Sequence, residues 1–127
     1  MSVLSFDHIH LRCPNPETTA IWFEEMLGAE IIRSQQQGQP RFDLKLGGLD
    51  IFLLPEGQGA APSPLAPYLG IDHFGFAVTG LDEYVAGLKA KGVTFTMEPT
   101  NPRPGIRICF IRGPENISIE ILERFPV

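Results

Sequence analysis

Cysteine is scarce in this sequence, and its two copies form no recognisable metal or redox motif. Cys13 and Cys109 stand far apart among the 127 residues, and neither belongs to a CxxC spacing. The pattern therefore argues against a structural zinc site or a thioredoxin-like motif. We interpret both as buried thiols of a cytoplasmic protein, because a reducing compartment keeps cysteines unpaired. A disulfide between the two is the alternative.

Long apolar runs and clusters of basic residues are also missing. No apolar run approaches the roughly 18 residues that a membrane-spanning helix needs, and we expect no signal peptide, because the start of the sequence shows neither a basic nor an apolar region. The formal net charge of −5, without a run of Lys or Arg, argues against a nucleic-acid-binding surface. We therefore expect no membrane partner and no nucleic-acid partner. With 43% hydrophobic and 20% charged residues, the chain has the composition of one globular domain.

One short motif occurs twice and divides the chain into two similar halves. The stretches SFDHIHLRC and GIDHFGFAV are both apolar strand patterns with Asp-His near the start. A helical pattern follows each of them and ends at a glycine. The separation of His8 and His73 equals that of these two glycines to within one residue. Such agreement across a strand and a helix indicates an internal repeat.

Each half predicts the element order of one strand, one helix and three strands. Asn15 is suited to cap the first helix and Pro16 to begin it, because the missing N–H of proline is not needed there. Gly28 is suited to end that helix in a left-handed conformation. The second helix is predicted to begin near Leu81 and to end at Gly92. The predicted strands are residues 6–13, 30–34, 41–46, 49–54, 72–79, 94–97, 105–112 and 117–122.

Two proline-containing stretches fall between these elements. Residues 56–70, rich in Pro, Gly and Ala, are predicted to link module one (residues 1–55) to module two (residues 71–127). Residues 98–108 contain three prolines, which oppose both helix and strand. We therefore predict that residues 98–108 form a loop over one end of a cavity.

The fold class expected from this order is α+β, with two βαβββ modules in a single domain. Neither module is large enough to bury both faces of its sheet alone. We therefore expect the modules to form a curved mixed sheet around a shared cavity.

The candidate metal ligands are two histidines and one glutamate. Side chains alternate along a strand, so His8 and His10 share one face while the apolar residues beside them take the other. His73 takes the equivalent place in module two. Glu120 interrupts a run of Ile and Leu, where a carboxylate is costly to desolvate unless it is paired or bound to a cation. Two imidazoles and one carboxylate suit Zn, Mn, Fe, Co or Ni.

A structural role is the alternative for each of these residues. A single histidine in a strand is more often structural than a ligand, and Glu120 can pair with Arg107, Arg112 or Arg124. Two Asp-His strands occur at repeat-equivalent positions, and a carboxylate lies in the final strand. This coincidence favours a metal site.

Longer motifs cover both modules. Module one contains the pattern DHI.L...N...T..WFEEMLGAEI, and module two contains IDHFGFAV and the closing GPENISIEIL. Through these residues nearly the whole chain resembles the vicinal oxygen chelate superfamily. That superfamily groups glyoxalase I, bleomycin-resistance proteins, fosfomycin-resistance transferases and extradiol dioxygenases. The resemblance implies the glyoxalase/bleomycin-resistance/dioxygenase fold.

The resemblance also implies which residues bind the metal. Carried over to this chain, the family's ligands are His8, His73 and Glu120. Many members have a further glutamate on the last strand of module one, and that position matches Phe52 by the Gly-Gly turn or Leu54 by the repeat offset. Neither side chain binds metal, so the chain departs from the four-ligand pattern of glyoxalase I and leaves coordination positions open.

A metal with open positions implies an enzyme that acts on a small oxygen-rich or aromatic metabolite, as a lyase, isomerase, dioxygenase or thiol transferase. Such an ion can polarise two neighbouring substrate oxygens, and Fe(II) in the same triad can activate dioxygen. The alternative is a metal-free small-molecule binding protein of the bleomycin-resistance type. The missing fourth ligand is consistent with this alternative.

The resemblance further implies a homodimer, in which one chain supplies His8 and the other supplies His73 with Glu120.

Further residues complete the predicted site. Glu120 and His10 are the catalytic candidates, with His10 as a general acid–base or a hydrogen-bonding group for the substrate. A wall residue bonded to a neighbouring strand is the alternative for His10. Arg103 or Arg107 can hold an anionic substrate, and a solvated surface arginine is the alternative for each. Phe52 is the remaining candidate contact to the substrate.

Overall fold

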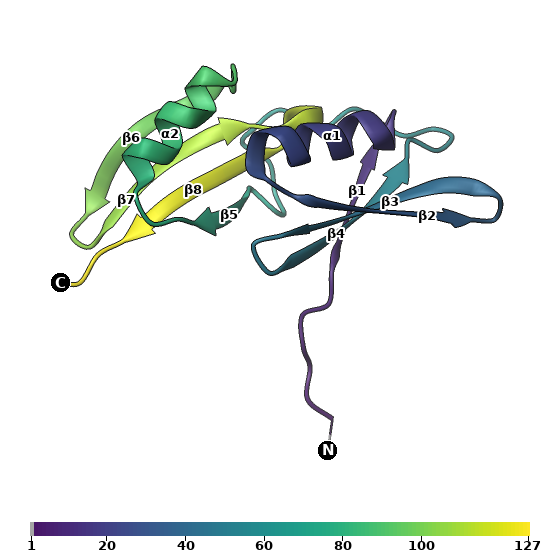
Figure 1. The fold of residues 1–127 in the computed structure, drawn as a ribbon, viewed down its shortest axis with the longest axis horizontal. Helices are drawn as coiled ribbons and strands as arrows, with labels where there is room; N and C mark the ends of the chain where they lie inside the picture. Colours follow the sequence, from purple (N-terminus) through teal and green to yellow (C-terminus); the bar gives the residue numbers. More distant parts are fainter. Residues whose placement is uncertain (1) are drawn as a thin grey trace. The chain divides into compact units, whose positions relative to one another are not determined.

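The computed structural model describes residues 2–127 and divides the chain into two compact units, with the boundary between Ala61 and Pro62. This boundary falls inside the stretch predicted to be a linker. Each unit contains one strand, one helix and three further strands, in that order (Figure 1). The predicted α+β class with a repeated βαβββ order is therefore confirmed.

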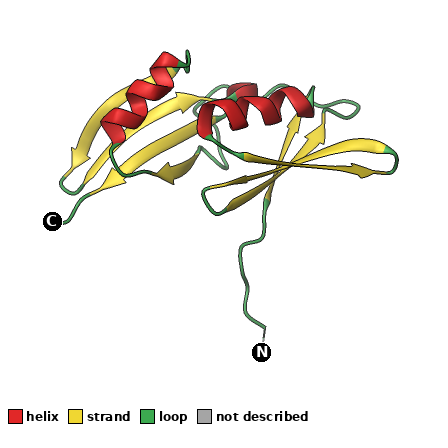
Figure 2. Ribbon diagram, viewed as in Figure 1, coloured by secondary structure: helices red, strands yellow, loops and turns green. Residues whose placement is uncertain are grey.

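The first unit forms a four-stranded mixed sheet with one helix on one face (Figure 2). Strand β1 pairs in parallel with β4, and the remaining pairs are antiparallel, which gives the order β1-β4-β3-β2. The elements are β1 (Ile9–Cys13), α1 (Pro16–Leu27), β2 (Glu30–Gln36), β3 (Gln39–Leu46) and β4 (Leu49–Pro55).

Helix α1 begins and ends where the local signals predict. The Asn15 side chain accepts a hydrogen bond of 3.2 Å from the backbone N–H of Thr18, and Pro16 is the first helical residue. Gly28 ends the helix with φ 77°, a left-handed conformation that costs glycine little. The buried side chains of Ala20 and Phe23 lie on the helix face that packs against the sheet.

The second unit repeats this arrangement. Its strand order is β5-β8-β7-β6, again with the first and last strands paired in parallel. Leu81, Val85 and Leu88 form the buried stripe of its helix. The elements are β5 (Phe74–Ala77), α2 (Leu81–Ala90), β6 (Phe95–Arg103), β7 (Ile106–Arg112), a 3-10 turn (Pro114–Asn116) and β8 (Ser118–Arg124).

The prediction of a loop over residues 98–108 is wrong. Strand β6 continues through Pro99 and Pro102 to Arg103, and β7 follows after a tight turn. Two features explain how the prolines are accommodated. Strand β6 lies at the edge of its sheet, and both prolines fall within register shifts between its pairs with β7. An edge strand has a neighbour on one side only, and a bulge leaves residues unpaired, so the missing N–H of a proline can be tolerated at either place.

The two Asp-His pairs lie just before their strands. Both β1 and β5 begin later than predicted, so Asp7-His8 and Asp72-His73 stand at the entrances of the strands. Cys13 and Cys109 are buried, as expected, each inside its own unit. Among residues 2–127, no helix is long and apolar enough to cross a membrane.

Helix α2 is capped by a side chain from the sheet. Its N-terminal residue Gly80 offers no capping group, and the Glu123 carboxylate of β8 instead accepts hydrogen bonds of 2.9 Å from the backbone N–H groups of Gly80 and Leu81. These bonds stabilise the ionised carboxylate and lower the pKa of Glu123 below its ordinary value of 4.5.

We expect Glu123→Gln to destabilise the folded state in a pH-dependent way. A lowered folded-state pKa contributes stability above about pH 4.5, and that contribution is lost as the pH falls through the lowered value. In urea unfolding, the variant should be less stable than wild type near neutral pH, and the difference should shrink in acid. Glu115→Gln, at an exposed turn position, is the matched control and should show neither effect. A pH-independent difference would contradict the assignment.

Candidate functional site

The second unit holds a histidine between two carboxylates. His73 Nδ1 lies 2.7 Å from Asp72 Oδ2, and His73 Nε2 lies 3.0 Å from Glu120 Oε1. The ring of Phe110 packs edge-on against the imidazole with the centroids 4.8 Å apart. Glu120 lies on β8 between β5 and β7, and its side chain is only 16% exposed. Gly75 is its partner on β5, so no side chain there competes for the space.

The charge around His73 favours its protonated form. The hydrogen bond to Asp72 raises the pKa of His73 above 6.5, and the bond and charge of Glu120 raise it further, while partial burial opposes the shift. An imidazolium can donate from both nitrogens, and both partners are carboxylates. In the absence of a cation, His73 and Glu120 therefore form a charge-assisted pair.

The first unit repeats half of this arrangement. His8 Nδ1 lies 2.6 Å from Asp7 Oδ2, as His73 lies beside Asp72. On its other side, the His8 ring stacks on Phe52 with the centroids 4.3 Å apart. His10 packs edge-on against both rings, at 4.9 Å from His8 and 5.3 Å from Phe52. His8 and His10 thus share one face, as the alternation of the strand predicts.

Strand register identifies the position equivalent to Glu120. In the second unit, Glu120 is the parallel partner of Gly75. In the first unit, the parallel partner of His10 is Phe52, whereas Leu54 pairs with Arg12. His10 and Gly75 are equivalent positions, because each stands two residues after the histidine of its Asp-His motif. Their strand partners are therefore equivalent too, and Phe52 occupies the place of Glu120. The first unit therefore has an aromatic ring where the second has a carboxylate.

His73 and Glu120 suit a divalent metal by their spacing. An ion held by an imidazole nitrogen and a carboxylate oxygen at about 2.0 to 2.2 Å, with a right angle between the two bonds, brings the two atoms to about 3 Å from each other. The observed separation of Nε2 and Oε1, 3.0 Å, agrees with that value. Asp72 supplies the outer carboxylate that commonly orients a metal-binding histidine, and Asp7 does so for His8.

The three predicted ligands are divided between the units, with His8 in the first and His73 and Glu120 in the second. Within each unit, residues 2–127 contain no group of three or more His, Cys, Asp or Glu side chains that could hold a metal. His73 and Glu120 are the predicted ligands that the structure shows in contact.

The arginines predicted to bind the substrate have other surroundings. Arg107 lies on the sheet face opposite to Glu120, because it pairs in register with Glu123, and it contacts Asp82 of α2 at 3.1 Å and Asn101 at 2.6 Å. It serves as a structural link between β7, α2 and β6. Arg103 is exposed at the β6–β7 turn.

Arg107 and Arg112 were alternative partners of Glu120, and in the structure both have other partners. Arg107 is engaged with Asp82, and Arg112 donates to the backbone carbonyl of Asn116. The partner of Glu120 is His73.

Arg41 belongs to the face that carries His8 and Phe52, and the sequence reasoning missed it. Its guanidinium carbon lies 5.1 Å from the centre of the Phe52 ring. Arg41 and Asp43 alternate with apolar residues on β3, and Asp43 is the register partner of Phe52. This alternation was the available signal, but only the pairing of β3 with β4 shows which side chain the charges meet.

Comparison with known proteins identifies the family. The sequence profile of the Glyoxalase/Bleomycin resistance protein/Dioxygenase superfamily matches residues 5–121. The chain belongs to this superfamily. The match covers parts of both units, and its range includes His8, His73 and Glu120.

Several solved structures share the fold of this chain. A glyoxalase/bleomycin resistance protein/dioxygenase domain from Frankia sp. EAN1pec is 23% identical, covers 98% of this chain and 100% of its own, and has a TM-score of 0.76. The fosfomycin resistance protein FosX from Listeria monocytogenes is 19% identical over 98% and 96% of the two chains, with a TM-score of 0.73. An integron cassette protein from V. cholerae is 25% identical over 97% of both chains, with a TM-score of 0.69. No curated protein sequence matches the chain.

In metal-free protein, we expect the His73 imidazole to titrate above 6.5 and Asp72→Asn to lower that pKa. The reason is that the bond to Asp72 is the largest contribution to the shift. Titration followed by NMR of the ring resonances measures both values. Asp82→Asn, which removes a carboxylate of the same unit that does not touch His73, is the control. An unchanged His73 pKa in Asp72→Asn would contradict the described contact.

Proposed function

We propose that the protein is a divalent-metal-dependent enzyme whose ion is held by His8, His73 and Glu120. The contact between His73 Nε2 and Glu120 Oε1 is the observation that carries the proposal, because its spacing suits two ligands of one ion. Membership of the glyoxalase/bleomycin resistance/dioxygenase superfamily supports it. We infer a cytoplasmic enzyme, since two buried thiols suit a reducing compartment.

The residues around the ligands prepare them for a cation. Asp7 and Asp72 each accept a hydrogen bond from the Nδ1–H group of the histidine that follows in the chain. This bond keeps the proton on Nδ1 and makes the Nε2 lone pair the one that would bind a metal. Partial burial of Glu120 makes an unpaired carboxylate costly, and either the His73 proton or a cation removes that cost. A proton and a metal therefore compete for the same pair of atoms.

A bound divalent ion would supply Lewis acidity toward two neighbouring oxygens of a substrate. His10 would hold or move a proton beside it, since its ring lies against His8 and is exposed. Phe52 would form an apolar wall next to the reacting group. The reaction would be a lyase, isomerase, dioxygenase or thiol-transfer reaction of a small oxygen-rich or aromatic metabolite.

A metal-free binding protein of the bleomycin-resistance type is the second candidate. Phe52 favours it, because an apolar ring replaces the carboxylate at the register position of Glu120. In that case the His73–Glu120 pair would only stabilise the second unit. The metal content of the protein distinguishes the two functions.

We expect wild-type protein to retain a stoichiometric divalent ion after purification without added metal. His73→Ala, Glu120→Gln and His8→Ala should lose it, with dissociation constants raised by at least about tenfold. His10→Ala is the matched control, because His10 neighbours His8 and is not a proposed ligand. It should keep the ion while turnover or substrate affinity falls. Atomic emission spectroscopy and calorimetric titration measure these changes. A wild type that binds no metal under any loading condition would favour the binding protein.

Phe52→Glu should add a ligand to the site. A glutamate at this position would lie beside His8 as Glu120 lies beside His73, because the two positions share the same register. The variant should bind the ion at least about tenfold more tightly. Leu54→Glu, on the same strand face two residues further along β4, is the control and should leave the affinity unchanged. Equal effects of the two substitutions would contradict the register assignment.

We further propose that the protein is a homodimer in which two chains complete each site. Mixing His8→Ala with Glu120→Gln protein would then restore metal binding to a fraction of the sites, because hybrid dimers contain one intact ligand set. Analytical ultracentrifugation checks the dimer itself. A monomer at working concentration would rule out this form of the site.

A further inference from the structure

The first sheet is split, and the second is not. Strand β3 pairs with β4 only between Asp43 and Leu46, although its hairpin with β2 continues for a further four residues to Gln39. In the second unit, β7 pairs with β8 along its whole length, from Ile106 to Arg112. The β2–β3 hairpin therefore separates from the end of β4, while the equivalent strands of the second unit remain joined.

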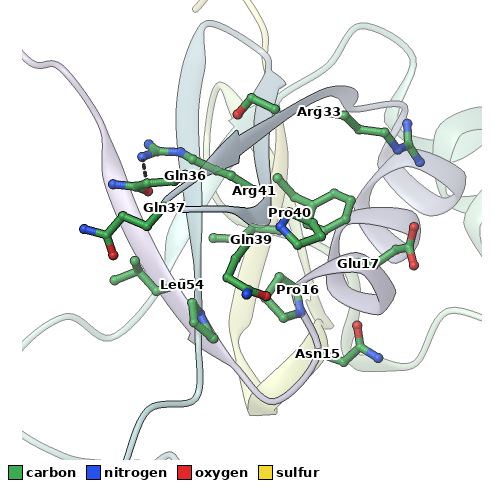
Figure 3. Close-up of a pocket in the computed structure, with 14 residues that line it drawn as sticks. Asn15, Pro16, Glu17, Arg33, Gln36, Gln37, Gln39, Pro40, Arg41 and Leu54 are labelled. Carbon is green, nitrogen blue, oxygen red and sulfur yellow. Dashed lines mark hydrogen bonds between the residues drawn. The ribbon is translucent and has the colours of Figure 1, made fainter.

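A pocket of about 650 Å³ occupies this split. It lies between the β2–β3 hairpin, the end of β4 and the start of α1 (Figure 3). This volume is in the range of about 300 to 1,000 Å³ that is usual for small-molecule sites. Apolar side chains make up much of its lining: Pro16, Pro40, Phe42, Leu53, Leu54 and Pro55.

One cation in this pocket is held in a fixed orientation. Arg41 Nε donates to the two oxygens of Asp43 at 3.0 and 3.2 Å, and Nη1 donates to Gln36 Oε1 at 2.8 Å. Within residues 2–127, Arg41 Nη2 has no hydrogen-bond partner. The guanidinium also lies over Phe52. In Figure 3, Arg41 and Arg33 extend to opposite sides of the hairpin.

We infer that this pocket binds a small carboxylate-bearing molecule with an apolar body, and that Arg41 Nη2 is its anion contact. The inference deepens the proposed function and rests on it in one respect. We take the molecule bound in this pocket to be the substrate of the proposed enzyme, which reaches His8 by passing Phe52. Arg41 joins the pocket to the Phe52 face, since it lines the first and lies over the second.

The charge beside Arg41 favours a monoanion. Asp43 already compensates part of the Arg41 charge, so a dianionic group would be repelled by Asp43 more strongly than a carboxylate. The side-chain amides of Gln36, Gln37 and Gln39 line the pocket and supply neutral hydrogen bonds.

The test uses benzoate as the probe and benzamide as its neutral counterpart, in NMR titrations of the full chain. Benzoate should shift the backbone amides of Gln36, Arg41 and Leu54, and benzamide should bind at least about tenfold more weakly. Arg41→Gln should weaken benzoate by about tenfold, whereas Lys45→Gln, on the same strand but outside the pocket lining, should leave it unchanged. Equal binding of the two probes, or loss of binding in Lys45→Gln alone, would overturn the assignment.

A second variant predicts a change of the opposite sign. Asp43→Asn removes the carboxylate that competes for Arg41 and should tighten benzoate by about fivefold. A variant that merely unfolds cannot bind more tightly, so this result separates the proposal from a loss of structure. Weaker binding in folded Asp43→Asn would overturn it.

Glu120→Gln distinguishes this inference from the proposed function. It should lose the metal and still bind benzoate, because Glu120 does not line the pocket. Arg41→Gln should keep the metal. Wild-type protein that binds benzoate but no metal would support the pocket and refute the metal enzyme. Wild-type protein that binds metal but no benzoate would support the metal enzyme and refute the pocket.

Discussion

The parallel pairing of the first and last strands in each unit is the constraint on which the rest of the site depends. It sets β1 beside β4 and β5 beside β8, so that a histidine at the start of one strand meets the middle of the other. In the second unit this places Glu120 at His73, and in the first it places Phe52 at His8. The helices and the antiparallel strands then bury the opposite face and fix both partners.

The two units differ by an exchange of side-chain chemistry between neighbouring strands. The first unit has an acid on β3, Asp43, and a phenyl ring on β4, Phe52, which are register partners. The second has the phenyl ring on β7, Phe110, and the acid on β8, Glu120, which are also register partners. As a result, the acid of the first unit pairs with Arg41, and that of the second pairs with His73.

Features set by local signals could be predicted from the sequence, and those set by strand pairing could not. The limits of α1 follow from Asn15, Pro16 and Gly28, which act within one turn of the helix. By contrast, the strand through Pro99 and Pro102 depends on its position at the sheet edge, which no local pattern encodes. The choice between Phe52 and Leu54 as the position equivalent to Glu120 needed the register, because the turns of the two halves differ in length.

The same reasoning explains which parts of the site the sequence indicated. The repeated Asp-His motif singled out His8 and His73, and the interrupted apolar run singled out Glu120. Arg41 was missed because its neighbours belong to β2 and β4, and the split between β3 and β4 has no signature in the spacing of residues. The contacts of Arg107 with Asp82 and Asn101 could not be foreseen, because a charged residue on a strand does not reveal which face of the sheet it occupies.

The strand entrances have one consequence for how this protein can change over time. Because Asp7-His8 and Asp72-His73 stand before β1 and β5, each imidazole takes its orientation from the residue that precedes it in the chain. The side chain across from it is therefore replaceable, while the neighbouring Ile51 and Leu53 keep the first core intact. A duplicated module can thus exchange a carboxylate for an aromatic ring at this position while it keeps the same fold.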